Sequence, residues 1–394
     1  MKEKNLDFDK VIERRGTGSL KYDCAKSRGY PEDITPLWVA DMDFMTSSFV
    51  IDAITERAKH GIFGYSEPSE SYFDAVYSWL NSRHGWQPRQ SWLVKTPGVV
   101  FALAAAVRAY TSQGEAVLIQ RPVYYPFSEV IEDNKRKVVS SDLVKLPDGG
   151  YAIDFYDFEK KIKQNNIKLF LLCSPHNPVG RVWTGDELKK IGEICLKYGV
   201  TVVSDEIHSD LVFYGSHSVF ASVDEKFADI SVICTSPSKT FNLAGLQVSN
   251  IFIPNEKLRS AFIRQVNAAG YSQLNALGLT ACEAAYRYGG EWYEKMIAYV
   301  RGNIEFTAKF LSENLPQIKL TPPQGTYLLW LDFNSLGLTE RQRQDLIVNK
   351  AGLWLDSGII FGESGNGYER INVACPEKTL EYALNKLKTA INNL

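Results

Sequence analysis

The sequence has neither a long hydrophobic run nor an excess of basic residues. Its 394 residues include 44 Lys and Arg against 46 Asp and Glu, a formal net charge of −2. The absence of an 18-residue apolar run argues against a membrane span, and the absence of a basic block argues against nucleic-acid binding. The N-terminal nine residues lack the apolar core of a secretory signal. We therefore expect a cytoplasmic protein that acts on small molecules.

Cysteine and histidine are few and scattered. The six cysteines include no C-x-x-C pair and no zinc-ligand spacing. His208 and His217 are too far apart in the sequence for a local metal pair. There is also no G-x-G-x-x-G, P-loop, G-x-S-x-G or H-E-x-x-H motif. We predict no metal site, and we expect the cysteines to be reduced core residues.

Between residues 90 and 255, short apolar runs alternate regularly with helical stretches. Val99–Thr111 and Asp186–Tyr198 are the clearest helices, and Thr184 with Glu187 predicts a capping box at the start of the second. Such alternation predicts an α/β fold in which helices cover both faces of a mostly parallel sheet. The predicted strands are Ser91–Val94, Ala116–Gln120, Leu169–Cys173, Thr201–Ser204, Ser231–Cys234 and Val248–Ile253.

The two ends of the chain have a different pattern. The sequence is irregular before residue 50, and after about residue 290 it shows long helices with an apolar strand pair, Thr326–Phe333 and Arg370–Val373. We expect residues 1–48 and 290–394 to pack together as a smaller α+β domain beside a large domain of residues 49–289.

Polar residues gather just after the C-terminal ends of five successive predicted strands, the edge at which open α/β sheets bind ligands. Each of these residues taken singly is more often a turn, cap or solvated residue. Together they supply a lysine, a carboxylate, an aromatic ring and several hydroxyl and backbone donors. The stretches are 96–98 (TPG), 121–124 (RPVY), 174–177 (SPHN), 204–206 (SDE) and 236–239 (SPSK).

This combination matches the requirements of pyridoxal phosphate. A lysine forms the Schiff base, and a carboxylate keeps the pyridine nitrogen protonated so that the ring can act as an electron sink. At about 3 Å and an effective dielectric of about 20, that ion pair has a Coulomb energy of roughly 5 kcal/mol.

Five longer stretches carry a family resemblance: 36–44 (PLWVADMDF), 61–65 (GIFGY), 173–181 (CSPHNPVGR), 204–211 (SDEIHSDL) and 238–246 (SKTFNLAGL). With them the sequence, from Phe8 to the C-terminus, resembles the fold type I pyridoxal phosphate enzymes and, among these, the MalY/PatB group of carbon–sulfur β-lyases. The resemblance implies a mostly parallel seven-stranded sheet in the large domain, a homodimer, and a place in amino-acid metabolism such as methionine biosynthesis.

Where this sequence matches the family's motifs, the resemblance implies catalytic roles for individual residues. Lys239 resembles the Schiff-base lysine, which also removes the Cα proton of the substrate. Asp205 would pair with the pyridinium, and Asn177 would hydrogen-bond the phenolic oxygen of the cofactor. Tyr124 would stack on its ring, with plain packing as the alternative.

The resemblance also implies a phosphate site at the start of a helix, where free backbone N–H groups and the helix dipole favour an anion. Tyr65 matches a tyrosine that the partner subunit contributes in this family, which implies shared active sites. The alternative is that Tyr65 packs within its own chain. The other residues expected around the phosphate are Gly98, Val99, Val100, Ser236 and Ser238.

The substrate's α-carboxylate suits a bidentate arginine, and Arg370 matches the family's carboxylate-binding residue. Asn177 and the backbone of Val39 and Ala40 would assist it. We predict no nucleic-acid or membrane partner.

Two departures from related aminotransferases bear on the reaction. Gln247 stands where they commonly carry a basic residue, and His208, expected near the cofactor, stands where they commonly carry a tyrosine. Both agree with the lyase group, so we predict β-elimination of cystathionine or cysteine-type amino acids to pyruvate, ammonia and a thiol. The alternatives are an aminotransferase and a cofactor-binding regulator, although the short N-terminus leaves no room for a DNA-binding domain.

Overall fold

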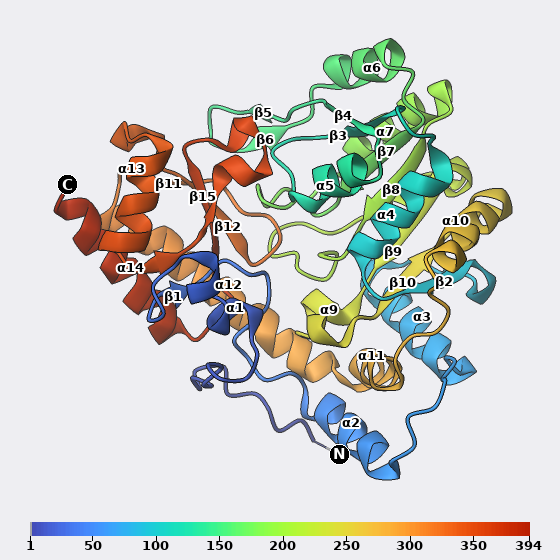
Figure 1. The fold of residues 1–394 in the computed structure, drawn as a ribbon, viewed down its shortest axis with the longest axis horizontal. Coiled ribbons are helices and arrows are strands. Elements are labelled where there is room, and N and C mark those ends of the chain that lie inside the picture. The colour runs from blue at the N-terminus through green and yellow to red at the C-terminus, as the bar shows by residue number, and fades with distance from the viewer. Residues whose placement is uncertain (1) are drawn as a thin grey trace.

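In the computed structural model, which describes residues 2–394, a seven-stranded sheet forms the centre of the fold (Figure 1). The strand order is β2-β10-β9-β8-β7-β3-β4. Only β10 runs antiparallel to its neighbours, so the predicted mostly parallel, seven-stranded α/β sheet is confirmed. The strands are β2 (Leu93–Thr96), β3 (Ala116–Ile119), β4 (Lys137–Ser140), β7 (Leu169–Cys173), β8 (Thr201–Asp205), β9 (Ser231–Thr235) and β10 (Ser249–Phe252).

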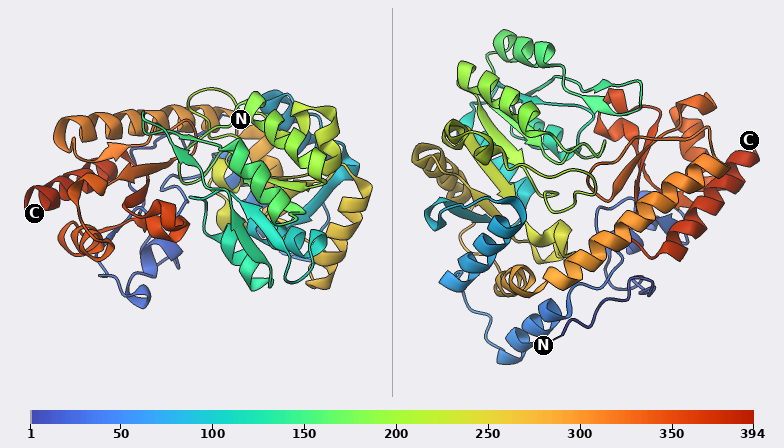
Figure 2. Two further views of the ribbon diagram at one scale, coloured as in Figure 1. Left: turned by 90° about the horizontal axis from the view of Figure 1, so that it is seen from above. Right: turned by 180° about the vertical axis from the view of Figure 1, so that it is seen from behind.

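Helices bury both faces of this sheet, as Figure 2 shows. Every residue of β7 is buried, and successive side chains point to opposite faces. Leu169 and Leu171 pack in one cluster with α4 (Val99–Tyr110) and α10 (Glu256–Ala268). Phe170 and Leu172 pack in another with α6 (Phe155–Gln164) and α7 (Gly185–Tyr198). Two buried faces explain why these strands are apolar without alternation.

The predicted capping box at the start of α7 is present. Thr184 Oγ1 accepts from the Glu187 N–H at 3.2 Å, and the Glu187 carboxylate accepts from the Thr184 N–H at 2.8 Å. The predicted first strand lies two residues later than expected, since a 3₁₀ turn occupies Gln90–Trp92.

Both chain ends contribute to one region beside the central sheet, where blue and red segments adjoin in Figure 1. β1 (Thr35–Pro36) pairs in parallel with β13 (Leu353–Trp354). The predicted strand pair is present as antiparallel β12 (Leu328–Asp332) and β15 (Tyr368–Asn372). They form a four-stranded sheet with β11 (Lys319–Leu320) and β14 (Asp356–Ser357). A long helix, α12 (Gly290–Asn314), runs toward this region (Figure 2). The domain boundaries at 48 and 290 stay a prediction.

Shorter elements complete the fold. Among the helices formed by residues 2–394, none is both long enough and apolar enough to cross a bilayer. The remaining helices are α1 (Leu20–Asp23), α2 (Ser48–His60), α3 (Glu70–His84), α5 (Pro126–Asp133), α8 (Phe220–Val223), α9 (Pro237–Thr240), α11 (Ala276–Tyr288), α13 (Glu340–Gln344) and α14 (Glu377–Asn392). The remaining strands are β5 (Val144–Lys145) and β6 (Tyr151–Ala152).

Candidate active site

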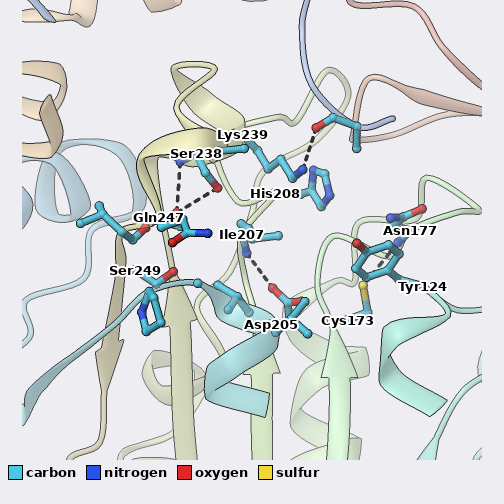
Figure 3. Close-up of a pocket in the computed structure, with 18 residues that line it drawn as sticks. Tyr124, Cys173, Asn177, Asp205, Ile207, His208, Ser238, Lys239, Gln247 and Ser249 are labelled. Carbon is cyan, nitrogen blue, oxygen red and sulfur yellow. Dashed lines mark hydrogen bonds between the residues drawn. The ribbon is translucent and has the colours of Figure 1, made fainter. Parts of the chain in front are cut away.

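A cavity opens at the carboxyl ends of β7, β8 and β9 and collects most of the predicted site residues (Figure 3). The predicted residues that do not line it are Val39, Tyr65 and Arg370. Several lining residues were not predicted, because they are small or apolar and carry no chemical signal in the sequence. The predicted residues in the lining are Ala40, Gly98, Val99, Val100, Tyr124, Asn177, Asp205, His208, Ser236, Ser238 and Lys239; the residues not predicted include Pro97, Cys173, Ile207 and Ser249.

Lys239 lies on the short helix α9, directly after β9, and reaches across the cavity. Its Nζ donates to the carbonyl oxygen of Ala40 at 2.6 Å, and Tyr327 Oη donates to the same oxygen at 2.9 Å. Burial lowers the pKa of Lys239 to about 8, although the charge of Asp41 opposes the shift. The amine is therefore a better base and nucleophile near neutral pH than an exposed lysine.

Asp205 ends β8 and is 5% exposed. Among residues 2–394, its carboxylate accepts one hydrogen bond, from the Ile207 N–H at 3.1 Å, and forms no ion pair with a basic side chain. Burial raises the pKa of Asp205 to about 7. A buried carboxylate without a cation is unfavourable. The protonated ring nitrogen of pyridoxal phosphate would supply that cation, so this acid fits the cofactor.

A buried polar network anchors the residue that follows Lys239. Thr240 Oγ1 donates to Asp210 Oδ2 at 2.7 Å, and Trp79 Nε1 donates to the same carboxylate at 3.1 Å. His84 Nε2 lies 2.9 Å from Asp210 Oδ1. Burial works to raise the pKa of Asp210, but His84 and these donors hold it below its usual value. These contacts fix the C-terminal end of α9, next to Lys239.

A matching network anchors the residue that follows Asp205. Glu206 accepts from Ser204 Oγ at 2.8 Å and from the Phe220 N–H at 3.0 Å, and His217 Nε2 lies 2.9 Å from its other oxygen. The rings of His84 and His217 meet edge to face at 5.3 Å. The sequence analysis rejected His208 and His217 as a metal pair and gave His217 no other role, because its contact with Glu206 depends on the path of the loop between them.

The end of the cavity predicted to hold phosphate is formed by α4 and the loop before Lys239. Gly98 caps α4, whose first backbone N–H groups have no partner within the helix. A Cβ added at Gly98 would meet no atom within 4 Å, so the space beside it is open. Ser236 Oγ lies 2.7 Å from Val248 O and accepts from the Ser238 N–H at 3.1 Å. The Ser236 hydroxyl therefore holds the loop in place. The hydroxyl proton of Ser238 remains available for donation to a ligand.

Tyr124, Asn177 and His208 line the wall of the cavity (Figure 3). The Tyr124 N–H donates to Asn177 O at 3.0 Å, and the Asn177 N–H donates to Cys173 Sγ at 3.4 Å. Burial, followed by the charges of Lys239 and Arg370, holds the pKa of His208 well below its usual value, so this ring is neutral. Its Nδ1 has no hydrogen-bond partner among residues 2–394.

Arg370, on β15, lies just behind this wall. Its Nη1 donates to Asn177 Oδ1 at 2.9 Å, and its Nη2 donates to Trp38 O at 2.9 Å and pairs with Asp356. Its Nε has no hydrogen-bond partner in the part of the chain that the structure describes. Two residues further along β15, Asn372 Nδ2 donates to Val39 O at 2.7 Å. The Asp356 pairing was not predicted, since Asp356 lies on the two-residue strand β14, which the sequence does not reveal.

Tyr65 lies outside the cavity of its own chain. It is 98% exposed, and it borders a second hollow with residues 270–277. Gln247 lines both this hollow and the cavity, and it adopts a left-handed backbone with φ 50°. Within one chain Tyr65 is therefore not part of the candidate site.

Comparison with known proteins supports a single family. The Aminotransferase class I and II model matches residues 32–387. Cystathionine beta-lyase PatB of Bacillus subtilis (strain 168) is 45% identical over 388 residues, which cover 98% of this chain and 100% of PatB.

Two solved structures agree over the same span. Cystalysin from Treponema denticola, which contains a pyridoxal 5'-phosphate cofactor, superposes with a TM-score of 0.95 at 39% identity, covering 98% of this chain and 99% of cystalysin. A PLP-bound protein of Clostridium difficile 630, named provisionally as an aminotransferase, gives a TM-score of 0.96 at 41% identity, covering 98% of this chain and 100% of that one. The chain therefore belongs to the aminotransferase class I and II family of pyridoxal-phosphate-dependent enzymes, in the group that includes PatB.

Proposed function

We propose that this protein is a carbon–sulfur β-lyase that acts on cystathionine and related S-substituted cysteines. In the overall reaction, the substrate and one water give a thiol, pyruvate and ammonia; the Cβ–S bond breaks and the Cα proton is removed. The observation that carries the proposal is that Lys239 and Asp205 face one cavity while Arg370 lies behind its wall. When bound, pyridoxal phosphate supplies an electron sink for charge developing at Cα.

Each residue around the cavity would have its own role in binding or in the reaction. Lys239 would hold the cofactor covalently and, once released by the substrate amine, would take the Cα proton on Nζ. Asp205 would keep a proton on the ring nitrogen. The free Nε of Arg370 offers a donor to the substrate carboxylate, and Asn177 and Tyr124 would orient the cofactor ring. Gly98, Val99, Val100 and Ser238 would hold the phosphate, with the neutral His208 beside Lys239.

A second copy of the chain would complete the site. Tyr65 belongs to an exposed apolar stretch with Ile62 and Phe63, and it borders the hollow that Gln247 joins to the cavity. Tyr65 of each subunit would enter the other subunit's phosphate site, giving a homodimer. Because all six cysteines are free thiols, a reducing cytoplasm is the proposed location.

The test is purified holoenzyme given L-cystathionine without any 2-oxo acid. The lyase is expected to release pyruvate and a thiol in equal amounts, and the Lys239→Ala variant should release neither. Lys95→Ala, which removes a partly exposed lysine from β2, is the matched control. Transamination of an amino acid with 2-oxoglutarate, without pyruvate release from cystathionine, would reject the lyase assignment.

An aminotransferase is the second candidate, because the two reactions need the same lysine, aspartate and arginine. They differ only after the Cα proton has been removed. In the lyase the sulfur would then leave from Cβ, and in the aminotransferase the proton would be delivered to the cofactor. Gln247 and the neutral His208 favour the lyase, since both stand where aminotransferases commonly carry a basic or phenolic group.

A further inference from the structure

The loop of residues 38–43, between β1 and α2, contacts the two basic residues that the proposed reaction needs. Arg370 Nη2 donates to the carbonyl oxygen of Trp38 at 2.9 Å, and Lys239 Nζ donates to the carbonyl oxygen of Ala40 at 2.6 Å. Because both acceptors are backbone groups, their positions depend on what holds the loop in place. The loop therefore helps to set where the amine of Lys239 lies.

Two acidic side chains of this loop bind two basic side chains from earlier in the chain. Arg14 donates to Asp41 from both Nη atoms, at 3.0 and 2.8 Å, and from Nη1 to Asp43 at 2.6 Å. Lys21 Nζ donates to Asp43 Oδ2 at 2.8 Å and lies 3.5 Å from Asp41 Oδ1. Lys21 is fully buried, and a buried ammonium group is unfavourable unless carboxylates compensate it. The two carboxylates therefore tie the loop to the N-terminal segment.

The loop is also attached to the segment that carries Lys239. Asn242, three residues after this lysine, accepts from the Met42 N–H at 2.9 Å and donates to the Met42 carbonyl oxygen at 3.0 Å. Asp41 lies between Ala40 and Met42 in the sequence. Its ion pairs therefore hold the loop at the point where both of these contacts are made.

Asp41 acts on Lys239 through its charge as well. Burial lowers the pKa of Lys239, and of the charges around the amine Asp41 opposes this shift most, ahead of Asp205. Burial works to raise the pKa of Asp41 itself, but the nearby cations hold it below its usual value, so this side chain is a carboxylate. The other ionisable side chains around Lys239 are Tyr124, Cys173, His208, Tyr327 and Arg370.

We propose that Asp41 is a positioning residue for Lys239: it holds the Ala40 carbonyl oxygen against Nζ and keeps a negative charge near the amine. The inference rests on the proposed lyase function, in which Lys239 takes the Cα proton and becomes an ammonium ion. A carbonyl acceptor and a nearby carboxylate both stabilise that ion more than the neutral amine. Asp41 therefore favours the transfer of the proton to Nζ.

The first test is chemical modification of the amine in the cofactor-free, full-length chain, which does not depend on turnover. Lys239 is acetylated with a trace of acetic anhydride across neutral and alkaline pH, and its peptide is quantified by mass spectrometry. Asp41→Asn keeps the shape of the side chain and removes its charge, so it should lower the midpoint of the labelling curve by about one pH unit. Asp33→Asn, at an exposed aspartate of the same N-terminal segment, is the matched control and should keep the wild-type midpoint.

The second test is the kinetics of pyruvate release from L-cystathionine by the holoenzyme. Asp41→Asn should lower kcat about tenfold and change KM less than about twofold, because it weakens an interaction that the transition state needs. Arg14→Gln should lower kcat as well, since the loop loses an anchor. It should not lower the labelling midpoint, because it removes a positive charge from the same network, and this difference separates positioning from a general loss of structure.

The outcomes separate this inference from the proposed function. An Asp41→Asn midpoint equal to that of the wild type, or one that falls equally in Asp33→Asn, would overturn the positioning role. Should Asp41→Asn fail to fold, an unchanged kcat in Arg14→Gln would overturn it instead. A wild type that releases no pyruvate, while the midpoint still falls in Asp41→Asn alone, would reject the lyase function and leave the positioning of Lys239 standing.

Discussion

Replacing Asp205 with asparagine isolates the effect of one buried charge. Asparagine can still accept the Ile207 N–H through its side-chain oxygen, so the backbone contact at the end of β8 is kept. The carboxylate has a pKa raised by burial from 3.8 to about 7. Between pH 3.8 and about pH 7, the cofactor-free native chain therefore binds more protons at this position than the unfolded chain does. As a result, the carboxylate destabilises the native state increasingly as the pH rises through this window.

The size of the effect follows from the same shift. A pKa raised from 3.8 to about 7 corresponds to at most roughly 4 kcal/mol of lost stability above pH 7. The cofactor-free Asp205→Asn chain should therefore exceed the wild type in free energy of unfolding, by an amount that grows by about 2–3 kcal/mol between about pH 5 and about pH 8. Denaturant unfolding of both chains across this range measures the difference directly.

The holoenzyme should respond in the opposite direction. In the proposed mechanism the ring nitrogen would pair with Asp205, and losing an interaction of about 3 kcal/mol in the transition state would lower kcat about a hundredfold. Asp133→Asn, an exposed change at the end of α5, is the control for both measurements. A cofactor-free Asp205→Asn chain that is less stable than the wild type near pH 8, or a difference independent of pH, would show that the buried carboxylate does not destabilise the native chain.

Three further predictions concern the lysine, the buried network and the dimer. Burial lowers the pKa of Lys239 to about 8. The rate of covalent attachment of pyridoxal phosphate to the cofactor-free chain, followed by visible absorption, should therefore rise with pH and level off above about pH 8. A rate that keeps rising toward about pH 10.4, the pKa of an exposed lysine, would contradict this. Asp210→Asn should cost about 1–3 kcal/mol in denaturant unfolding near neutral pH, since it weakens the bonds to Thr240 and His84. The pKa of Asp210 is held below its usual value, so the stability that this carboxylate contributes is present above the unfolded-state pKa and is lost as the pH falls through the folded-state pKa. An unchanged free energy of unfolding in Asp210→Asn would disprove the anchoring role. Mixing inactive Lys239→Ala with Tyr65→Ala subunits should restore up to about a quarter of wild-type activity, because each mixed dimer has one complete site; no recovery would place Tyr65 outside its partner's site.

The sequence predicts the central strands well, because they are buried on both faces. Leu169–Cys173 is found with its predicted bounds, as expected for an apolar run between two helix layers. β4 was not predicted, since Lys137–Ser140 is a short edge strand that is only partly buried. The antiparallel direction of β10 was not predicted either, because direction depends on the path of the connection and not on strand composition.

The candidate site is predictable where chemistry follows a strand end and unpredictable where it depends on distant partners. Asp205 ends β8, and Lys239 follows the neighbouring parallel strand β9, so their place in one cavity follows from the fold class. The pairing of Arg370 with Asp356 joins two strands of the smaller sheet, and His217 meets Glu206 through a loop. Such contacts are set by tertiary packing, which the spacing of residues does not record.

Peptide mapping after borohydride reduction of the holoenzyme tests the central claim, that Lys239 is the residue to which the cofactor is bound. Reduction fixes the cofactor to its lysine, and we expect a single pyridoxyl group, on the peptide that contains Lys239 and on no other. Label on a different lysine, or an unlabelled Lys239 in a protein that retains its visible absorption, would contradict it.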